Sequence, residues 1–204
     1  MKDAAYLREV YNKRFKEPLN RWSSADLKSC RRIVSRNIKW TKVRPDRTIN
    51  ILDVGCATGY YTKAFFLEGF NAYGLDYSDV AISKASQLHP ECHFIHMDGF
   101  NPQTDLRFDL IFCKGFSGCN THVIKDVSEW SNKYIDLLQP GGKFILSYST
   151  DFTGIEGDEE TVNWTKDEIK EYASQINANY TGLNIYLRHG IFSKIYLAIK
   201  NIMS

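Results

Sequence analysis

The sequence predicts an α/β fold: a Rossmann-like, doubly wound sheet of seven mostly parallel strands, with N-terminal helices before it and a C-terminal antiparallel hairpin. Two observations carry this prediction. From residue 46 onward, apolar runs of strand length alternate with segments of helical periodicity, which is typical of a parallel sheet covered by helices. The first run leads into an acid and a glycine-containing turn within residues 49–61, where open α/β sheets bind nucleotide-like ligands.

Residues 1–45 are expected to form a helical cap. Helices are expected at 1–17 and at roughly 24–40, and in the second one Leu27, Cys30, Val34 and Ile38 recur at helical spacing. Ser23 or Ser24 can cap the start of that helix. Because no repeat, low-complexity stretch or linker interrupts the chain, residues 1–204 are expected to be a single domain with residues 46–204 as its core.

Strands of the core are expected at residues 49–54, 71–75, 92–97, 108–113 and 143–148. The helices that accompany them are expected at 59–68, 79–88, 122–138 and 166–177. Gly69 stands where a C-terminal helix cap is wanted, and Pro140-Gly141-Gly142 indicates a turn before the fifth strand. Two further strands, 182–189 and 192–200, are expected around a turn at His189-Gly190, which would close the sheet as a hairpin.

Composition favours a globular protein of the reducing cytoplasm. At 204 residues, 43% of them hydrophobic, the chain can bury a core of good size. No apolar run reaches the length of a membrane span, and the polar start Met1-Lys2-Asp3 is unlike a signal peptide. Five cysteines, an odd number with no Cys-x-x-Cys pair, argue for reduced thiols and against a disulfide framework or structural zinc. We therefore expect a cytoplasmic location and no membrane partner.

Charge is distributed unevenly along the chain. Residues 1–49 hold 14 Lys and Arg against 5 Asp and Glu, whereas the rest of the chain holds 12 against 19. A basic N-terminal segment on an acidic body could cover an anionic substrate or contact RNA. A solvated helix face explains the same pattern equally well.

The turn after the first strand distinguishes between classes of nucleotide-like ligand. A dinucleotide fingerprint reads G-x-G-x-x-G, and its glycines let the backbone approach a pyrophosphate. This chain instead has G-x-x-x-G at Gly55 and Gly59, with Asp53 two residues before the first glycine. A carboxylate there would repel a pyrophosphate and suit a positively charged ligand. The spacing therefore argues against a nicotinamide oxidoreductase.

This turn resembles motif I of the class I S-adenosylmethionine-dependent methyltransferases, whose cofactor carries a sulfonium and an ammonium group. The resemblance implies that Asp53, Gly55, Cys56, Ala57 and Gly59 form part of the site for S-adenosylmethionine, and that residues 46–204 are a cofactor-binding core. Ala57 departs from the family, which commonly has a third glycine there, and its methyl group crowds the loop slightly.

Two further acids stand at positions that match the family. Asp76 lies 21 residues after the first glycine, where a carboxylate can accept hydrogen bonds from the ribose hydroxyls, and Tyr77 follows it. Asp98 matches the position that takes the adenine amino group, with Gly99 supplying a backbone N–H and either Phe100 or Met97 lying against the adenine face. Taken alone, the first acid could be a helix-start residue and the second part of an ordinary turn.

Residues 108–114, which include Cys113, resemble motif IV, and residues 138–143 resemble the turn before the fifth strand of the family. A closing antiparallel hairpin is also a property of the family. The resemblance covers about residues 49–200 and rests on several motifs in the right order. The first 40 residues match no motif.

Because open α/β sheets react at the carboxyl ends of their strands, the loops there are expected to hold the methyl acceptor. The expected substrate contacts are Tyr11, Trp22, Lys114, Phe116, Tyr148 and Arg188. Among them, the lysine and arginine, with the basic N-terminal segment, could hold a phosphate or carboxylate. The two N-terminal aromatic residues could form a lid or make a plain helix–core contact.

Two histidines are candidates for a general base. Histidine titrates near neutral pH, so His122 or His189 could accept a proton from the acceptor. Each also fits as an ordinary helix-start or turn residue. Cys92 and His96 face one side of their strand and His93 faces the other, so they do not converge as metal ligands, and no metal is expected.

The resemblance implies an enzyme that transfers a methyl group in line to an oxygen or nitrogen of a small, anionic metabolite or sugar-type precursor. An RNA or protein methyltransferase that uses the basic N-terminal segment is the alternative. The Asn/Asp-Pro-Pro-Tyr motif of base amino-methylating enzymes is absent after the fourth strand, where the chain reads Cys113-Lys114-Gly115-Phe116. A subunit that binds the cofactor without catalysis is a third possibility. The acceptor and the oligomeric state are left open.

Overall fold

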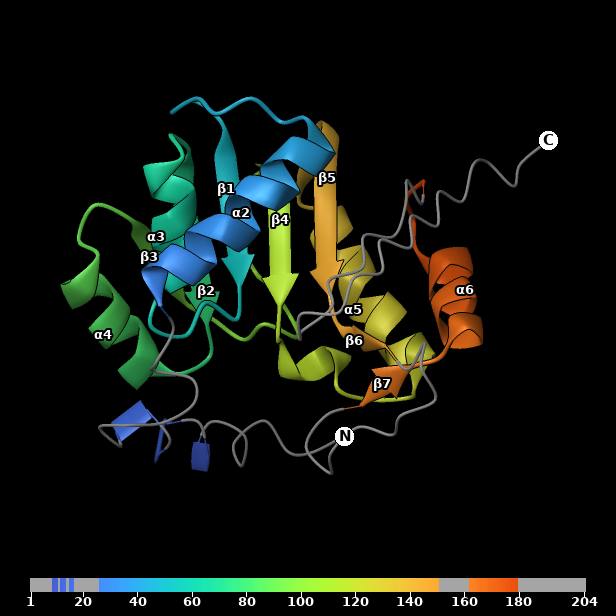
Figure 1. The fold of residues 1–204 in the computed structure, drawn as a ribbon. Coiled ribbons are helices and arrows are strands. Elements are labelled where there is room, and N and C mark those ends of the chain that lie inside the picture. The colour runs from blue at the N-terminus through green and yellow to red at the C-terminus, as the bar shows by residue number, and fades with distance from the viewer. Residues whose placement is uncertain (1–8, 11, 14, 17–25, 151–161, 180–204) are drawn as a thin grey trace.

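The main sheet has five parallel strands. The computed structural model describes residues 9–10, 12–13, 15–16, 26–150 and 162–179 (Figure 1). The strands lie in the order β3-β2-β1-β4-β5, and every neighbouring pair is parallel. Their bounds are Asn50–Val54 (β1), Asn71–Asp76 (β2), His93–His96 (β3), Phe108–Lys114 (β4) and Leu138–Ser147 (β5). The order reverses direction at β1, as in doubly wound folds, so the predicted Rossmann-like parallel sheet is confirmed.

The prediction of seven strands in one sheet is corrected to five for the part of the chain that the structure describes. After β5 the chain forms a separate two-stranded parallel sheet, in which β6 (Ser149–Thr150) pairs with β7 (Asn163–Trp164). Figure 1 shows these short strands just beyond the carboxyl end of β5. The hairpin predicted at 182–189 and 192–200 lies outside the described residues.

The central strands are buried on both faces, because helices cover each side of the sheet. In β1, Ile51 and Leu52 point to opposite faces and are 0% and 1% exposed. The first belongs to a core with Phe65, Phe70 and the β4 residue Phe112. The second belongs to a core with a different set of buried side chains, among them Phe108, Ile111, Trp130 and Tyr134.

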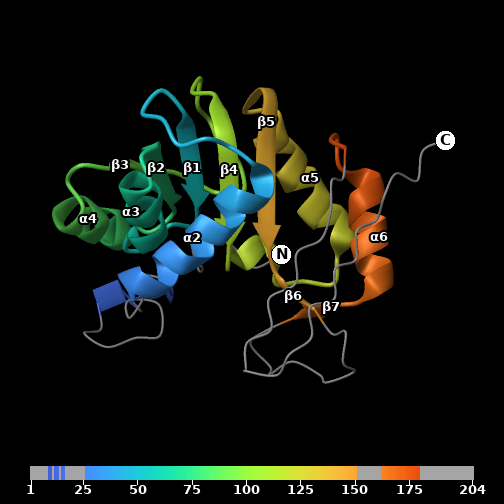
Figure 2. The ribbon, with the colours of Figure 1, turned by 45° about the horizontal axis from the view of Figure 1, so that its top comes forward.

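Two layers of helices form these cores (Figure 2). One face of the sheet is covered by α2 and α3, with α4 beside α3, and the other face is covered by α5, on which α6 packs. Their bounds are Leu27–Thr41 (α2), Tyr60–Leu67 (α3), Asp79–Leu88 (α4), Ile124–Ile135 (α5) and Lys166–Gln175 (α6). Within the described parts of the chain, none of the helices is long and apolar enough to cross a bilayer.

The start of α2 is set by an acid. Asp26 is the N-cap, and its carboxylate accepts hydrogen bonds from the backbone N–H groups of Lys28 and Ser29, both at 3.1 Å. These bonds satisfy two of the N–H groups that a helix start leaves without intrahelical partners. The helix therefore begins at Leu27, whereas a start near residue 24 with a serine cap was predicted.

The boundary between α5 and β5 differs from the prediction. The helix was expected to run to residue 138, and Pro140-Gly141-Gly142 was expected to form a turn. Instead α5 ends at Ile135, and Leu138 already pairs with Phe108 of β4. The pairing then shifts register, and Gly141 has a φ of +81° within β5. The glycines therefore form an irregularity inside a strand, which a local turn pattern does not distinguish from a turn.

Candidate cofactor and acceptor site

The turn between β1 and α3 repeatedly adopts left-handed backbone. Gly55, Ala57 and Gly59 have φ values of +72°, +49° and +82°. The N–H groups of Gly55 and Cys56 both donate to the carbonyl of Leu75 in β2, at 2.8 and 2.9 Å. The turn is therefore fixed to the neighbouring strand, and Ala57 adopts a conformation that favours glycine.

Asp53 lies beneath this turn and is 2% exposed. Its Oδ2 accepts a hydrogen bond from the hydroxyl of Thr62 in α3 at 2.7 Å. Burial raises the pKa of Asp53 to about 7, although the hydrogen bonds from Thr62 and the charge of Lys114 oppose the rise. The carboxylate predicted to flank the cofactor turn is thus an interior group whose charge changes near neutral pH.

Asp76 joins the end of β2 to the turn after β1. Its carboxylate accepts hydrogen bonds from the backbone N–H of Ala57 and of Ser78, each at 2.8 Å. Burial raises the pKa of Asp76, and these N–H donors work against the rise. Tyr77 follows Asp76, and its carbonyl meets a ring nitrogen of His96 at 3.0 Å. The structure therefore brings together the two carboxyl-end segments predicted to hold the cofactor.

The loop after β3 is held from the opposite side by α5. The hydroxyl of Tyr134 donates to the carbonyl of Gly99 at 2.8 Å, and the amino group of Lys133 donates to the carbonyl of Phe100 at 3.0 Å. Within the loop, Asp98 accepts the N–H of Phe100 at 2.9 Å. The segment predicted to meet the adenine ring is thus held in place by two side chains of α5.

Phe116 connects this loop to the turn after β1. A Cβ added at Gly55 would lie 3.3 Å from its ring, one at Gly99 would lie 2.8 Å from it, and one at Gly118 would lie 2.6 Å from it. On its other side the ring packs edge-on against Trp130, with 5.1 Å between ring centroids. Phe116, which was predicted to contact substrate, therefore packs between the two predicted cofactor loops.

Two of the predicted cofactor residues have buried thiols. Cys56 is 6% exposed and Cys113 is 0% exposed, and burial raises the pKa of both thiols well above the ordinary value. Any contact they make with a cofactor would therefore come from the main chain.

Beside Cys113, Lys114 extends from the end of β4 toward the ring of Tyr61, with 5.7 Å between its amino nitrogen and the ring centroid.

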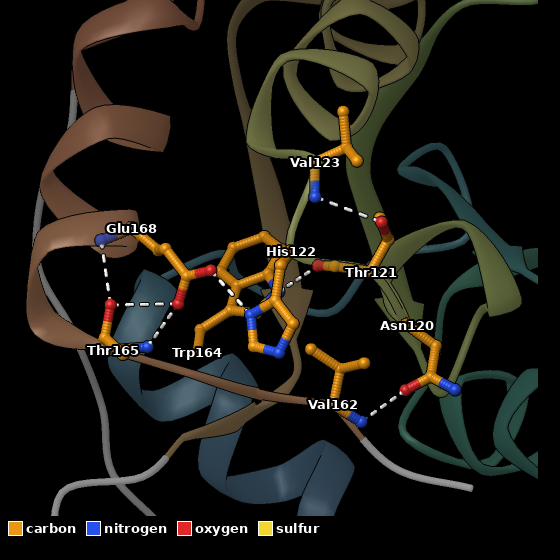
Figure 3. A network of polar contacts seen from close by, with 8 residues as sticks. All are labelled: Asn120, Thr121, His122, Val123, Val162, Trp164, Thr165 and Glu168. Atoms are coloured by element: carbon orange, nitrogen blue, oxygen red, sulfur yellow. Dashed lines mark hydrogen bonds and ion pairs between the residues drawn. The ribbon is translucent and has the colours of Figure 1, made fainter. Parts of the chain in front are cut away.

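His122 follows the short 3₁₀ helix η1 (Ser117–Cys119) at the carboxyl end of β4. Figure 3 shows its ring facing the first turn of α6, where Nδ1 lies 2.6 Å from Oε1 of Glu168. The same carboxylate forms the capping box of α6 with Thr165. His122 is therefore paired with an acid that is 46 residues away in the sequence.

Trp164 links the loop of His122 to the end of β5. Its indole N–H donates to the carbonyl of Thr121 at 3.0 Å (Figure 3), and its ring lies 4.3 Å from that of Tyr148, measured between centroids. Trp164 is 0% exposed. The predicted acceptor-side residues Tyr148 and His122 are thus held near one another by a residue that the sequence did not indicate.

Four predicted site residues lie outside the described residues: Tyr11, Trp22, Arg188 and His189. Three contributors were missed: Thr62 beneath the turn, Trp164 and Glu168. The Thr165-x-x-Glu168 spacing is a readable capping signal, but nothing in it indicates a histidine partner. Within the part of the chain that the structure describes, no three His, Cys, Asp or Glu side chains are grouped as metal ligands would be.

These residues fit S-adenosylmethionine. Asp76 offers carboxylate oxygens at the edge of the turn, as hydroxyl donors of a ribose require. The turn leaves no room for a side chain, because a Cβ at Gly59 would lie 2.7 Å from the ring of Phe94. Beneath it, Asp53 supplies an acid that a cationic ligand would favour in its charged form.

Comparison with known proteins agrees with this geometry. Residues 45–194 match the model of a family described as methyltransferase domain. Over 116 residues the chain is 28% identical to malonyl-[acyl-carrier protein] O-methyltransferase of Buchnera aphidicola subsp. Baizongia pistaciae (strain Bp). That match covers 56% of this chain and 45% of the relative, so the chain spans less than half the length of that protein.

Solved structures show the same fold. Magnesium protoporphyrin IX methyltransferase from Synechocystis PCC 6803, solved with bound S-adenosylhomocysteine, has a TM-score of 0.62 at 16% identity, covering 84% of this chain and 88% of that one. The sugar N-methyltransferase KedS8 from Streptoalloteichus sp. ATCC 53650 has a TM-score of 0.54 at 18% identity, covering 65% and 53%. From the family match over residues 45–194, this chain belongs to the methyltransferase domain family.

Proposed function

We propose that this protein transfers the methyl group of S-adenosylmethionine to an oxygen or nitrogen atom of a small, anionic metabolite or sugar-type precursor. The observation that carries the proposal is the contact between Asp76 and the N–H of Ala57, which joins the ribose position to the left-handed turn. The sulfonium methyl that the cofactor supplies is already a good electrophile. The chain therefore has to orient the acceptor, which accounts for up to about 7–11 kcal/mol of a barrier in well-aligned cases.

The residues divide into two groups. In the proposal the cofactor contacts are Asp53, Gly55, Cys56, Ala57, Gly59, Asp76, Tyr77, Asp98, Gly99, Phe100 and Cys113. The acceptor lies at the carboxyl ends of β4 and β5, near Lys114 and Tyr148, where His122 accepts a proton. Tyr11, Trp22, Arg188 and His189 keep their predicted roles as proposals.

The acceptors of similar proteins support a small molecule. One is named for a malonyl group carried on a protein and methylated at oxygen, another for a porphyrin, and a third for a sugar methylated at nitrogen. Small acceptors of this kind require no added nucleic-acid domain. They also leave both oxygen and nitrogen as target atoms.

The proposal is tested by incubating the full chain with methyl-labelled S-adenosylmethionine and a metabolite extract, then identifying labelled products by mass. We expect labelled small molecules whose formation is lost in Asp76→Ala and retained in the surface variant Lys170→Ala. Label found only in RNA or protein fractions would contradict the proposal. So would binding of the cofactor with no transfer to any fraction, which would leave a cofactor-binding subunit.

One feature favours the alternative of an RNA or protein target. The exposed face of α2 carries Lys28, Arg31 and Arg32, and these side chains line an open groove of about 470 Å³ between α2 and α3. Glu68 also lines this groove, and its Oε1 lies 3.5 Å from Nη2 of Arg31. Phosphate-backbone binding weakens steeply with added salt. If this face holds a nucleic acid, turnover should fall steeply between 50 and 200 mM salt, whereas a small-molecule reaction should change little.

A further inference from the structure

The geometry points to Glu168 as the residue that positions His122 for proton acceptance from the methyl acceptor, an inference that rests on the proposed function. The two side chains meet at 2.6 Å between Nδ1 and Oε1. They come from segments that are separate in the sequence, the loop after β4 and the first turn of α6 (Figure 3).

Glu168 is held so that one carboxylate oxygen is directed at the ring. Its Oε2 accepts the backbone N–H of Thr165 at 2.7 Å and the hydroxyl of Thr165 at 2.9 Å. Burial raises the pKa of Glu168, but the hydrogen bonds from Thr165 and His122 outweigh it and leave the pKa below the ordinary value. The group is therefore an oriented carboxylate, and 17% of its side chain is exposed.

The carboxylate decides which ring nitrogen of His122 faces the acceptor. An acceptor-only group at Nδ1 places the proton of the neutral ring on Nδ1, so Nε2 keeps a lone pair. Among the described residues none is hydrogen-bonded to Nε2, and 63% of the side chain is exposed. The ring therefore presents an exposed proton acceptor, and its loop follows the carboxyl end of β4.

The surrounding contacts hold the loop of His122 in place. Asn120 accepts the N–H of Val162 at 2.6 Å, and Thr121 accepts the indole N–H of Trp164 at 3.0 Å (Figure 3). Both residues that flank His122 on its N-terminal side are thus tied to the segment that leads into α6. These two hydrogen bonds hold the loop, and the contact with Glu168 holds the ring through Nδ1.

In the proposed step, the hydroxyl or amine of the acceptor gives its proton to Nε2 as its lone pair forms the bond to the methyl carbon. The electron pair of the carbon–sulfur bond goes to sulfur, and S-adenosylhomocysteine leaves. The imidazolium ring is then balanced by the negative charge of Glu168 and loses its proton to water.

Several charged groups in the first turns of α5 and α6 have interactions of their own. In the first turn of α5, Lys125 lies 3.8 Å from Glu129. In the first turn of α6, Asp167 lies 2.7 Å from Lys170. Lys166 also begins α6 and has an interaction of its own. In the described part of the chain, Glu168 is the charged side chain that contacts the ring.

The test compares Glu168→Gln with Thr165→Ala. A glutamine at this third helical position can still complete the capping box, so Glu168→Gln removes the charge and keeps the cap. Thr165→Ala removes the hydroxyl of the cap and keeps the charge. We expect Glu168→Gln to lower kcat by at least about tenfold with little change in the KM for S-adenosylmethionine. We expect Thr165→Ala to keep most of the wild-type kcat.

Thr165→Ala should lower Tm although it keeps most of its kcat. A purely structural role for Glu168 would give a different result: a lowered Tm in both variants and a wild-type kcat in Glu168→Gln. That result would overturn the inference.

The nitrogen NMR signals of the ring separate this inference from the proposed function. The His122 signals are assigned with His122→Gln and recorded at alkaline pH without any substrate. Signals of the Nδ1–H tautomer in the wild type that become those of a tautomer mixture in Glu168→Gln support the pairing. The same tautomer in both proteins overturns the inference whether or not an acceptor has been found. A changed tautomer in a protein that methylates no fraction overturns the proposed function, and the positioning role falls with it.

Discussion

The hydroxyl of Thr62 donates a hydrogen bond to the carboxylate of Asp53, with 2.7 Å between Oγ1 and Oδ2. The two residues lie on successive elements, β1 and α3, and the cofactor turn connects them. Gly74, the partner of Asp53 in β2, makes this contact possible, because a Cβ there would lie 2.7 Å from Oγ1 of Thr62. The turn therefore lies over a buried acid. Among the described residues, Thr62 is the side chain that donates a hydrogen bond to this acid.

The buried acid predicts a pH-dependent effect of Asp53→Asn on stability. The folded-state pKa of about 7 lies above the ordinary value of about 3.9, so the folded protein holds a proton that the unfolded chain loses. The contribution of Asp53 to the free energy of unfolding is fully present below about pH 4. It is lost as the pH rises toward 7, and the loss is at most about 4 kcal/mol. Asp53→Asn should therefore gain stability over wild type as the pH rises from 5 to 8, measured by urea unfolding.

Thr62→Val is the matched control, since it removes the donor and leaves the acid. It should destabilise the protein by roughly 1–3 kcal/mol at pH 8, where the acid is charged. Parallel stability curves for wild type and Asp53→Asn across this pH range would show that Asp53 has an ordinary pKa.

The turn predicts that Ala57→Gly stabilises the protein. Ala57 has a φ of +49°, and a left-handed conformation costs a non-glycine residue roughly 1–2 kcal/mol. Part of the stability gained by removing this cost is offset, because glycine loses more conformational entropy on folding than alanine does. We expect a gain of about 0.5–1 kcal/mol in denaturant unfolding. Ala64→Gly, in the middle of α3, should lose stability instead, and a loss in both variants would contradict the strain at Ala57.

The packing of Phe116 predicts that Gly99→Ala weakens cofactor binding. Its Cβ would lie 2.8 Å from the ring of Phe116, so the loop after β3 must shift. Overpacking of this kind costs roughly 1–3 kcal/mol, and we expect the Kd for S-adenosylmethionine to rise at least about tenfold by calorimetry. Phe116→Leu in the same chain should restore part of the affinity. If the double variant binds no better than Gly99→Ala, the ring is not what the loop packs against.

Asp76 is expected to be required for cofactor binding and dispensable for the fold. Asp76→Ala removes two acceptors for ribose hydroxyls, and charge-assisted hydrogen bonds contribute about 1.5–3 kcal/mol each. The Kd for S-adenosylmethionine should rise by about 100-fold or more, while the circular dichroism spectrum stays that of wild type. Asp76→Asn should be intermediate, because its amide still offers one oxygen to the N–H of Ala57. Unchanged affinity in Asp76→Ala would disprove the ribose assignment.

The segments that form the five strands and the cofactor turn could be predicted because their signals are local. An apolar run, an acid and two glycines lie within residues 49–61, and the left-handed φ values of Gly55 and Gly59 follow from glycine chemistry. The start of β5 could not be predicted this way. Leu138 joins the sheet because Phe108 is beside it, and that pairing is tertiary.

The acceptor side was predicted less completely for the same reason. His122 was identified as a candidate base from its place after the fourth strand. Its partner Glu168 reads in the sequence as a helix cap and nothing more. Trp164 lies next to that cap, and its role appears only when Thr121 and Tyr148 are seen against it. Long-range pairs of this kind have no signature in periodicity or spacing.

The central claim is that a buried acid beneath the turn matches the positive charge of the cofactor. It is tested most directly by the ratio of affinities for S-adenosylmethionine, which carries a sulfonium, and S-adenosylhomocysteine, which does not. Because Asp53 ionises near pH 7, the preference for the sulfonium should increase from pH 6 to pH 8 in the wild type and stay constant in Asp53→Asn. A wild-type ratio that does not change with pH, or a protein that takes up NAD or a nucleoside triphosphate instead, would contradict the claim.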